Sequence, residues 1–423
     1  MSEFDKIIGY NDIKTELMKI CDVIRNTAKY DALGVAPVAG LLLNGQPGVG
    51  KTLMANCFIK ESGRKAYVLR KDKPDGEFVN EIKNVFTEAM KNAPSIILLD
   101  DMDKFANVDN YHQDAEEYVT IQSCIDEIKG KGVFVVATTN GTRKMPGSLL
   151  RAGRFDFIIN IKEPEGQDAI DIVRFYLSKK KVIADINAEE IAHLLCGNSC
   201  ASLETIINIA GQYAGYKNKT MIDMDDIISA CLRVIYDAPE SNKPHDPTTL
   251  KKTAYHEAGH VVVNEILEPN CVDLVSVRKA YSGDYGITTF HNTNEYWNSF
   301  EHMENRVIAL LAGKAATEIV FGDVDLGAVD DLNRAFRIAS RFVDDYCTYG
   351  FNFSEERGVN VNSFELIQRK ENRLAVDIEK YYTKAKKILI DHREFLDALA
   401  KRLQEKDTLV GSEIREIKVK VGE

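Results

Sequence analysis

The sequence lacks the features of several protein classes. Among its 423 residues there is no apolar run of about 18, and the N-terminus has no secretory-signal pattern. Basic residues are outnumbered by acidic ones, and the net charge of −11 gives no electrostatic support for binding nucleic acid. We therefore expect a cytoplasmic chain that encodes no membrane association of its own, unless it is a fragment of a longer protein.

Closely spaced cysteines are also scarce. Of the eight cysteines only Cys196 and Cys200 lie near each other, and no second pair completes a zinc ribbon. Such scatter in a long chain indicates free thiols in a reducing compartment. The 44% hydrophobic and 28% charged residues are typical of a globular chain, and the length suggests about three modules.

The first chemical motif is a phosphate-binding loop. A buried strand is predicted at 39–44 and an apolar helical run begins at Leu53, with G-x-x-x-x-G-K-T between them. Backbone N–H groups of the loop can surround phosphates, while Lys51 reaches the β- and γ-phosphates and Thr52 binds Mg²⁺. The residues predicted to bind ATP here are Gly45, Pro47, Gly48, Val49, Gly50, Lys51, Thr52 and Leu53.

Two more core strands are predicted to end in polar residues. The strand at 95–99 precedes Asp100 and Asp101, and the strand at 133–139 precedes Asn140. We expect Asp100 to hold Mg²⁺, Asp101 to activate the attacking water, and Asn140 to position it. Arg151 and Arg154 follow at a spacing that suits arginine fingers acting on a neighbour's γ-phosphate; the alternative is a solvated or salt-bridged pair.

The third module opens with H-E-x-x-H at 256–260, in an apolar helical run. His256 and His260 are four residues apart on a helix, so both rings can reach one metal ion. Glu257 is suited to act as the general base of a metal-assisted hydrolysis. A catalytic zinc site needs a third protein ligand. From charge alone, the acidic cluster at 323–331 is explained as a complement to a helix dipole.

Other segments of the chain complete the organisation. Apolar residues at helical spacing fill 163–236, and the Pro-rich, polar segment 237–250 is predicted to be a linker, with His245 a solvated loop residue. Two strands are predicted at 272–277 and 283–290, and the edge from Gly286 to Phe290 suits strand addition by an extended substrate. His291, His302 and His392 are expected to be core or surface residues.

The order of the first motifs resembles the AAA+ ATPases. The segment 148–156 is similar to that superfamily's second region of homology, which implies finger roles for Arg151 and Arg154 and makes Asn140 the sensor-1 residue. The opening residues 4–10 resemble the segment that lines the adenine pocket, which implies that Ile8 and Gly9 contact the base. Residues 163–236 are then the helical lid, although Asn198, Cys200 and Ser202 replace the family's Phe, Gly and Asp.

Two departures from the AAA+ pattern stand out. Asp101 occupies the place of the usual Glu and is one methylene shorter. The segment 69–78 lacks the aromatic-hydrophobic-Gly tripeptide that grips substrate in the pore. Phe78 is the candidate gripping residue; alternatively, it is the first core residue of the helix that follows.

The later motifs resemble the FtsH family of membrane-linked AAA+ zinc proteases. The matching segments are 255–260, 311–324 and 327–335. In that pattern the third zinc ligand corresponds to Asp331, with Asp330 as the runner-up. The resemblance implies an α/β P-loop AAA+ module (1–162, with a parallel sheet), a helical lid (163–236) and a linker (237–250). A mainly α-helical zinc metallopeptidase domain (251–423) follows.

The resemblance implies an ATP-dependent zinc endopeptidase. It would use Zn²⁺, ATP and Mg²⁺, assemble as a ring, with a hexamer expected, and unfold, translocate and degrade unfolded or tagged proteins. One alternative is an ATP-driven unfoldase with a vestigial peptidase domain, and a weaker one is a slow ATP-binding assembly. FtsH proteins carry transmembrane helices before the ATPase. We therefore expect this chain to be either a fragment or a soluble variant, and Met1 favours the soluble variant.

Overall fold

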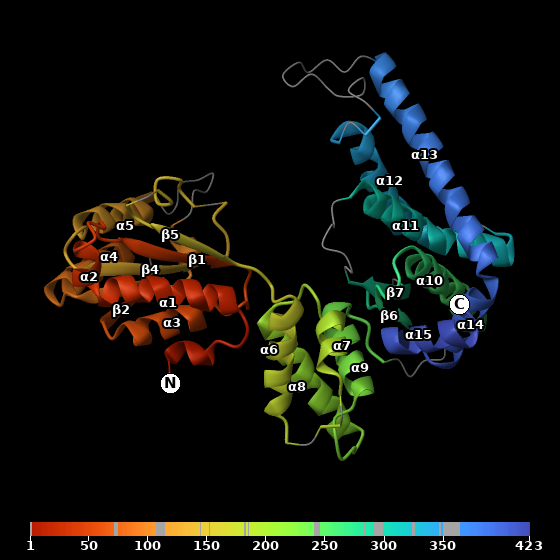
Figure 1. Cartoon of the computed structure of the whole chain (residues 1–423), viewed down its shortest axis with the longest axis horizontal. Coiled ribbons are helices and arrows are strands. Elements are labelled where there is room, and N and C mark those ends of the chain that lie inside the picture. Colours follow the sequence, from red (N-terminus) through yellow and green to blue (C-terminus); the bar gives the residue numbers. More distant parts are fainter. Residues whose placement is uncertain are drawn as a thin grey trace. The chain divides into compact units, whose positions relative to one another are not determined.

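The computed structural model divides the chain into two compact units, Met1–Met224 and Asp225–Glu423 (Figure 1). The structure describes residues 2–71, 75–106, 115–143, 145–151, 153–181, 183–184, 186–240, 246–282, 285–291, 299–323, 326–346, 348–349 and 364–423.

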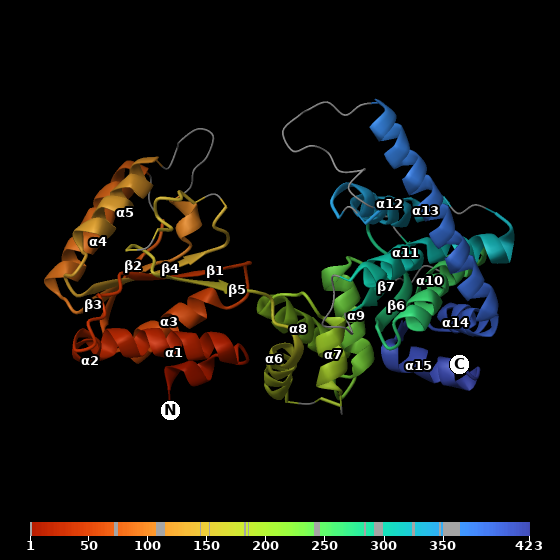
Figure 2. The same ribbon diagram turned by 45° about the horizontal axis from the view of Figure 1, so that its top comes forward.

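A five-stranded parallel sheet forms the centre of the first unit, in the order β2-β3-β4-β1-β5. Its central strands are continuous apolar runs because helices cover both faces. Figure 2 shows α4 and α5 on one face and α1 and α3 on the other. The strands are β1 (Gly40–Gly45), β2 (Lys65–Leu69), β3 (Ser95–Leu99), β4 (Val133–Thr139) and β5 (Phe157–Ile161).

The helices around this sheet begin where the sequence changes character. α3 starts directly after the phosphate-binding loop, and α4 buries an apolar stripe against the sheet and α5. The bounds are η1 (Glu3–Lys6), α1 (Asn11–Arg25), α2 (Thr27–Asp31), α3 (Lys51–Ser62), α4 (Asp75–Lys91), η2 (Met102–Lys104) and α5 (Ala115–Glu127).

The segment predicted to be a helical lid is helical. α6 (Gly166–Ser178), α7 (Ala188–Leu194) and α8 (Cys200–Tyr216) lie in the first unit, and α9 (Met224–Ile235) begins at its last residue. Asn187 and Ser199 cap α7 and α8 by accepting hydrogen bonds from backbone N–H groups of the first turn.

The second unit is mainly helical, as predicted. α10 (Pro247–Leu267) begins inside the predicted linker, because Asp246 caps it and Pro247 suits the first helical turn. His245 lies outside the described residues. The other helices are α11 (Phe300–Phe321), η3 (Leu326–Ala328), α12 (Val329–Asp344), α13 (Phe364–Asp391), α14 (Arg393–Glu405) and α15 (Gly411–Lys420).

A small antiparallel sheet completes the second unit, with the order β7-β6-β8. Its strands are β6 (Val272–Lys279), β7 (Tyr285–Phe290) and β8 (Thr408–Val410). α10 and α11 pack closely at Gly259, where an added Cβ would lie 2.7 Å from the carbonyl oxygen of Ala312. This close approach brings α11 against the helix that carries the histidines.

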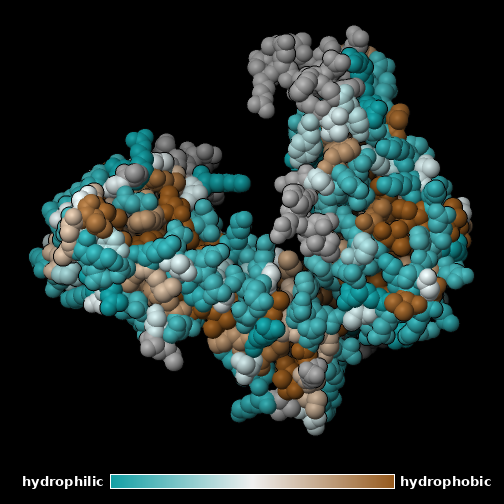
Figure 3. Space-filling view, in the orientation of Figure 1, coloured by the Kyte–Doolittle hydropathy of each residue, from teal (hydrophilic) through white to brown (hydrophobic). Residues whose placement is uncertain are grey.

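The surface of each unit, as far as Figure 3 shows it, is largely hydrophilic with separate hydrophobic patches. None of the described helices combines the length and the apolarity that crossing a bilayer requires.

Candidate nucleotide site and metal centre

A cavity of about 570 Å³ lies over the phosphate-binding loop in the first unit. Gly48 and Gly50 have positive φ angles of 85° and 96°, which side chains disfavour and which turn the loop's backbone into the start of α3. The predicted residues that line the cavity are Ile8, Pro47, Gly48, Val49, Gly50, Lys51, Thr52, Leu53, Asp101 and Asn140.

Three predicted residues, Gly9, Gly45 and Asp100, do not line this cavity but lie beside residues that do. Gly9 has a positive φ of 66° and an added Cβ would lie 3.1 Å from the Asp168 carbonyl oxygen. The lid side of the cavity is lined by Ile172, Phe175, Tyr176, Cys200, Ala201 and Glu204, of which the sequence pointed only to the segment that contains Cys200. The adjacent aromatics on α6 were the available signal, but their spacing also fits a helix core.

Lys51 and Asn140 lie together, as a phosphate-binding lysine and a water-positioning amide should. The Lys51 Nζ donates to Asn140 Oδ1 at 2.9 Å and to the carbonyl oxygens of Gly45 and Gln46 at 2.8 Å. Burial lowers the pKa of Lys51. The Asn140 backbone N–H donates to Asp103 Oδ1 at 3.0 Å, so Asp103 orients the sensor residue and was missed from the sequence.

Asp100 lies buried at the end of β3 and is fully engaged. Its Oδ1 accepts from Thr138 Oγ1 at 2.8 Å and from Thr52 Oγ1 at 3.2 Å. Its Oδ2 accepts from Arg70 Nε at 2.8 Å. The Thr52 hydroxyl and the Asp100 carboxylate are oxygen ligands of the kind Mg²⁺ takes, so these residues fit the metal of a bound nucleotide.

Asp101 differs from Asp100 in lying at the cavity and partly exposed. It adopts a left-handed conformation with φ 53°, and its Oδ2 accepts from Lys104 Nζ at 2.7 Å. Asp101 and Lys104 both line the cavity, so this ion pair lies at it.

The two candidate finger arginines have different surroundings. Arg154 donates from Nε and Nη2 to the two oxygens of Asp126, at 3.1 and 2.7 Å, and from Nη1 to the Ser148 carbonyl oxygen. Arg151 is exposed. Arg154 therefore matches the salt-bridged alternative within its own subunit, and only Arg151 presents its side chain to solvent.

Phe78 does not present its ring for gripping substrate. It is fully buried in α4 and packs edge-on against Phe105, with ring centroids 5.2 Å apart. The alternative interpretation, a core residue at the start of the helix, is the one that the structure supports. Residues 72–74 of the same segment lie outside the described residues.

The metal centre in the second unit joins two helices. His256 and His260 project from α10, and Asp331 from the first turn of α12. The three ligand atoms, both Nε2 atoms and Asp331 Oδ2, lie 3.1–3.2 Å from one another. Ligands bound to one tetrahedral zinc at about 2.0–2.1 Å lie about 3.3–3.4 Å apart, so this donor set fits zinc.

Neighbouring groups hold these ligands in place. His260 Nδ1 lies 2.8 Å from the Ala309 carbonyl oxygen, which directs Nε2 into the centre. Gly313 on α11 leaves room for both imidazole rings, because an added Cβ there would lie 2.5 Å from the Nε2 atoms of His256 and His260. Burial raises the pKa of Asp331, but hydrogen bonds from His256 and His260 outweigh it and hold that pKa below its usual range.

The third-ligand prediction is met by Asp331 rather than Asp330. Asp331 belongs to the described group of side chains that can hold one ion, whereas Asp330 is exposed and is not in that group. The two residues are neighbours at the start of α12, and the direction of the helix decides between them.

Glu257 lies beside the metal centre and is held by the small sheet. Thr288 Oγ1 on β7 donates to Glu257 Oε2 at 2.6 Å. An added Cβ at Gly286 would lie 2.0 Å from Glu257 Oε1, so only glycine fits there. Burial raises the pKa of Glu257, as suits a carboxyl group that takes up a proton during reaction.

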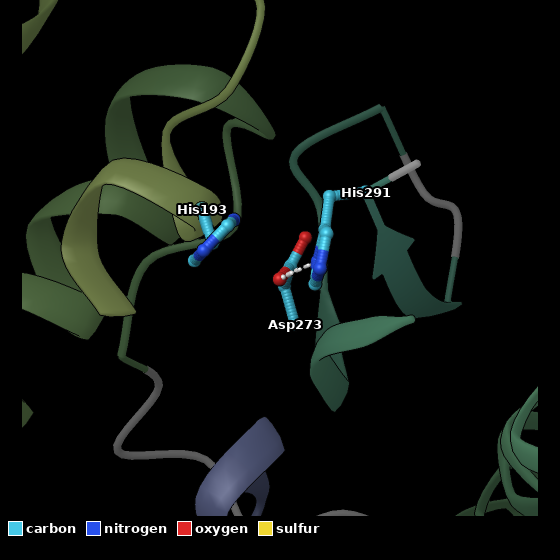
Figure 4. A group of neighbouring side chains, drawn as sticks. All are labelled: His193, Asp273 and His291. Atoms are coloured by element: carbon cyan, nitrogen blue, oxygen red, sulfur yellow. Dashed lines mark hydrogen bonds and ion pairs between the residues drawn. The ribbon is translucent and has the colours of Figure 1, made fainter. Parts of the chain in front are cut away.

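The other histidines in the described part of the second unit pair with carboxylates. His291 Nδ1 lies 2.5 Å from Asp273 Oδ1 (Figure 4). His302 lies 2.7 Å from Glu268, and His392 lies 2.6 Å from Glu423.

Comparison with known families agrees with both sites. The family model for the ATPase family associated with various cellular activities (AAA) matches residues 41–163. The model for peptidase family M41 matches residues 245–417 and includes His256, His260 and Asp331. The protein is thus of the class that joins an AAA ATPase domain to an M41 peptidase domain, and the predicted fold class is confirmed.

Curated relatives match nearly the whole chain. ATP-dependent zinc metalloprotease FtsH 2 of Thermoanaerobacter sp. (strain X514) is 29% identical and covers 97% of this chain and 82% of its own length. FtsH of Caldicellulosiruptor bescii is 29% identical, and the match spans 98% of this chain and 71% of that protein. FtsH of Synechococcus sp. is 28% identical, and the match spans 98% of this chain and 69% of that protein. The chain is FtsH-like, as its motifs predicted.

Proposed function

We propose that this protein is an ATP-dependent zinc endopeptidase that unfolds, translocates and degrades proteins as a ring. The observation that carries the proposal is the metal centre: three ligand atoms lie 3.1–3.2 Å apart beside the buried Glu257. An intact ligand set with its general base argues against a vestigial peptidase domain. The AAA domain on the same chain supports fuelling by ATP.

The peptidase step follows from the residues around Glu257. Zinc bound by His256, His260 and Asp331 supplies Lewis-acid chemistry that makes water nucleophilic near neutral pH. Glu257 takes a proton from the attacking water at its carboxylate and passes it to the leaving amine. Thr288 keeps that carboxylate oriented by its hydrogen bond of 2.6 Å.

Substrate binding is assigned to the edge of the small sheet. β7 is the outer strand in the order β7-β6-β8, and among the described residues no strand pairs with its other side, where an extended chain could add. The same strand carries Thr288, which contacts Glu257. A peptide added along β7 would therefore run past the general base.

The ATPase step uses the first unit. Lys51 and the loop amides bind the phosphates, Thr52 and Asp100 bind Mg²⁺, and Asp101 and Asn140 act on the water. Ile8 and Gly9 contact adenine, and residues 163–236 form the lid. Arg151 reaches a neighbouring subunit's γ-phosphate, which requires a ring; a hexamer is the expected size. Arg154 is the second predicted finger, and within one chain its guanidinium pairs with Asp126.

The setting of the protein is part of the same proposal. The seven cysteines in the described part of the chain are all free, which fits a reducing compartment such as the cytoplasm. The proposed substrates are unfolded or tagged proteins.

Degradation of an unfolded protein such as casein, with and without ATP, tests the proposal. Lys51→Ala is expected to abolish the ATP-dependent part of cleavage. Glu257→Gln is expected to abolish cleavage while ATP hydrolysis continues, since it changes only the peptidase centre. The matched control is Glu301→Gln, a change at an exposed glutamate of α11. Stoichiometric zinc without any cleavage by the unaltered protein would instead favour the unfoldase alternative.

A further inference from the structure

Arg70 binds the carboxylate that is assigned to Mg²⁺. It follows the last residue of β2, and its Nε donates to Asp100 Oδ2 at 2.8 Å, with Nη2 close to the same oxygen. The Asp100 side chain is only 4% exposed, whereas that of Arg70 is 60% exposed. A positive charge is thus held at a buried carboxylate from its solvent side.

The two oxygens of Asp100 have different partners. Oδ1 accepts from Thr138 and from Thr52, the threonine of the phosphate-binding loop. Oδ2 accepts from Arg70. A guanidinium at this distance repels a divalent cation and occupies the Asp100 oxygen that such a cation would otherwise bind.

The position of Arg70 in the chain extends this contact to other elements. Beside it, the Leu69 carbonyl oxygen accepts from the Asp100 backbone N–H at 3.1 Å, which fixes the end of β2 to β3. On the other side, Lys71 Nζ lies 3.6 Å from Oε1 of Glu117, a buried residue of α5. Arg70 thus lies between two fixed points, the end of β2 and the Lys71–Glu117 pair, while its own side chain is exposed.

We propose that Arg70 competes with the metal ion of the bound nucleotide for Asp100. Binding of metal and nucleotide displaces the guanidinium from Asp100 Oδ2. The inference rests on the proposed ATPase function and adds a regulation of that site. The coupling is reciprocal: the ion pair between Arg70 and Asp100 lowers the affinity for the metal by the same factor by which bound metal weakens the ion pair.

The test measures metal binding directly, with the full chain and Mn²⁺ as the probe in place of Mg²⁺. Electron paramagnetic resonance reports free Mn²⁺ during titration of the protein with saturating ADP. Arg70→Gln removes the competing charge and is expected to lower the Mn²⁺ concentration of half-saturation about tenfold. Arg70→Lys keeps a charge but loses the two-atom contact, and a smaller decrease of about threefold is expected.

The matched control is Lys71→Gln, which removes the adjacent charge that pairs with Glu117. It is expected to change half-saturation less than about twofold, because the proposed effect comes from contact with Asp100. The inference is overturned if the Mn²⁺ concentration of half-saturation stays the same or rises in both Arg70 variants. It is also overturned by an equal decrease in Lys71→Gln, which would indicate a general effect of charge. If the unaltered chain binds no Mn²⁺–ADP, the ATPase proposal itself fails.

Discussion

The metal centre and the nucleotide site differ in how far one chain completes them. At the metal centre three ligands converge, the general base lies beside them, and a backbone carbonyl and Thr288 orient the side chains. At the nucleotide site the functional groups bind each other: Lys51 bonds to Asn140, and Asp100 to Arg70. The peptidase centre is therefore preorganised, whereas the ATP site must exchange partners when it binds and is proposed to need a neighbour's arginine.

This difference follows from the chemistry of each reaction. A metal ion replaces protons at fixed ligands, so a site can be built in advance with little motion. An ATPase must change state during each cycle, and internal ion pairs that compete with the ligand, as proposed for Arg70, give the site a second arrangement.

Arg151→Ala is expected to lower ATP hydrolysis about a thousandfold, because a finger stabilises charge in the transition state. Mixing Arg151→Ala subunits with Lys51→Ala subunits tests whether the finger acts in trans. Some interfaces of the mixed ring join an intact Lys51 to a neighbour's intact Arg151, so activity should return. No recovery, with mixed rings verified by mass spectrometry, would mean that the ATP site is complete within one subunit.

Asp331→Asn is expected to weaken zinc binding at least about a hundredfold, because it removes one of three ligands from a preorganised centre. Zinc content after dialysis against a graded chelator measures the effect. Asp330→Asn is the matched control at the neighbouring exposed position and should retain zinc. Loss of zinc in the Asp330 variant instead would show that α12 presents its other carboxylate to the metal.

Thr288→Val is expected to lower kcat for peptide cleavage about tenfold, because it removes a hydrogen bond to the carboxylate of Glu257. Since that bond lowers the pKa of Glu257, its loss should raise this pKa and move the acidic limb of the pH profile upward. Thr288→Ser keeps the hydroxyl and should restore both values. ATP hydrolysis should stay unchanged in both variants, and a fall in it would indicate a structural effect.

Asp126→Asn is expected to destabilise the first unit by about 1 kcal/mol or less at neutral pH, since its pair with Arg154 is partly exposed. Hydrogen bonds from Arg154 and Lys129 lower the pKa of Asp126 to about 2. Because this pKa is lower in the folded than in the unfolded state, the ion pair stabilises the fold at pH values above the ordinary pKa of Asp. That stabilisation is lost as the pH falls through the lowered pKa. The difference from the unaltered protein should therefore vanish between about pH 4 and pH 2, measured by urea unfolding. A pH-independent difference would contradict the ion pair.

Local motifs predicted the chemistry of both sites well. In G-x-x-x-x-G-K-T and H-E-x-x-H, all the functional residues lie within one loop or one turn of a helix, where backbone geometry alone sets their spacing. Three of the five strands also followed from sequence, because β1, β3 and β4 are short apolar runs that end in polar residues. Their parallel arrangement was implied by the resemblance to AAA+ ATPases.

Tertiary packing decided the contacts between residues that lie far apart in the sequence. Asp331 reaches His260 across 71 residues of chain, and Thr288 reaches Glu257 across 31. The burial of Phe78 and the pairing of Arg154 with Asp126 depend on which helix packs beside each side chain. By itself the sequence determined that the protein holds nucleotide phosphates and a metal ion, because those residues are neighbours along the chain. Only the folded structure selected the third ligand and the partners of Glu257 and Asp100, because these contacts join elements that no local pattern connects.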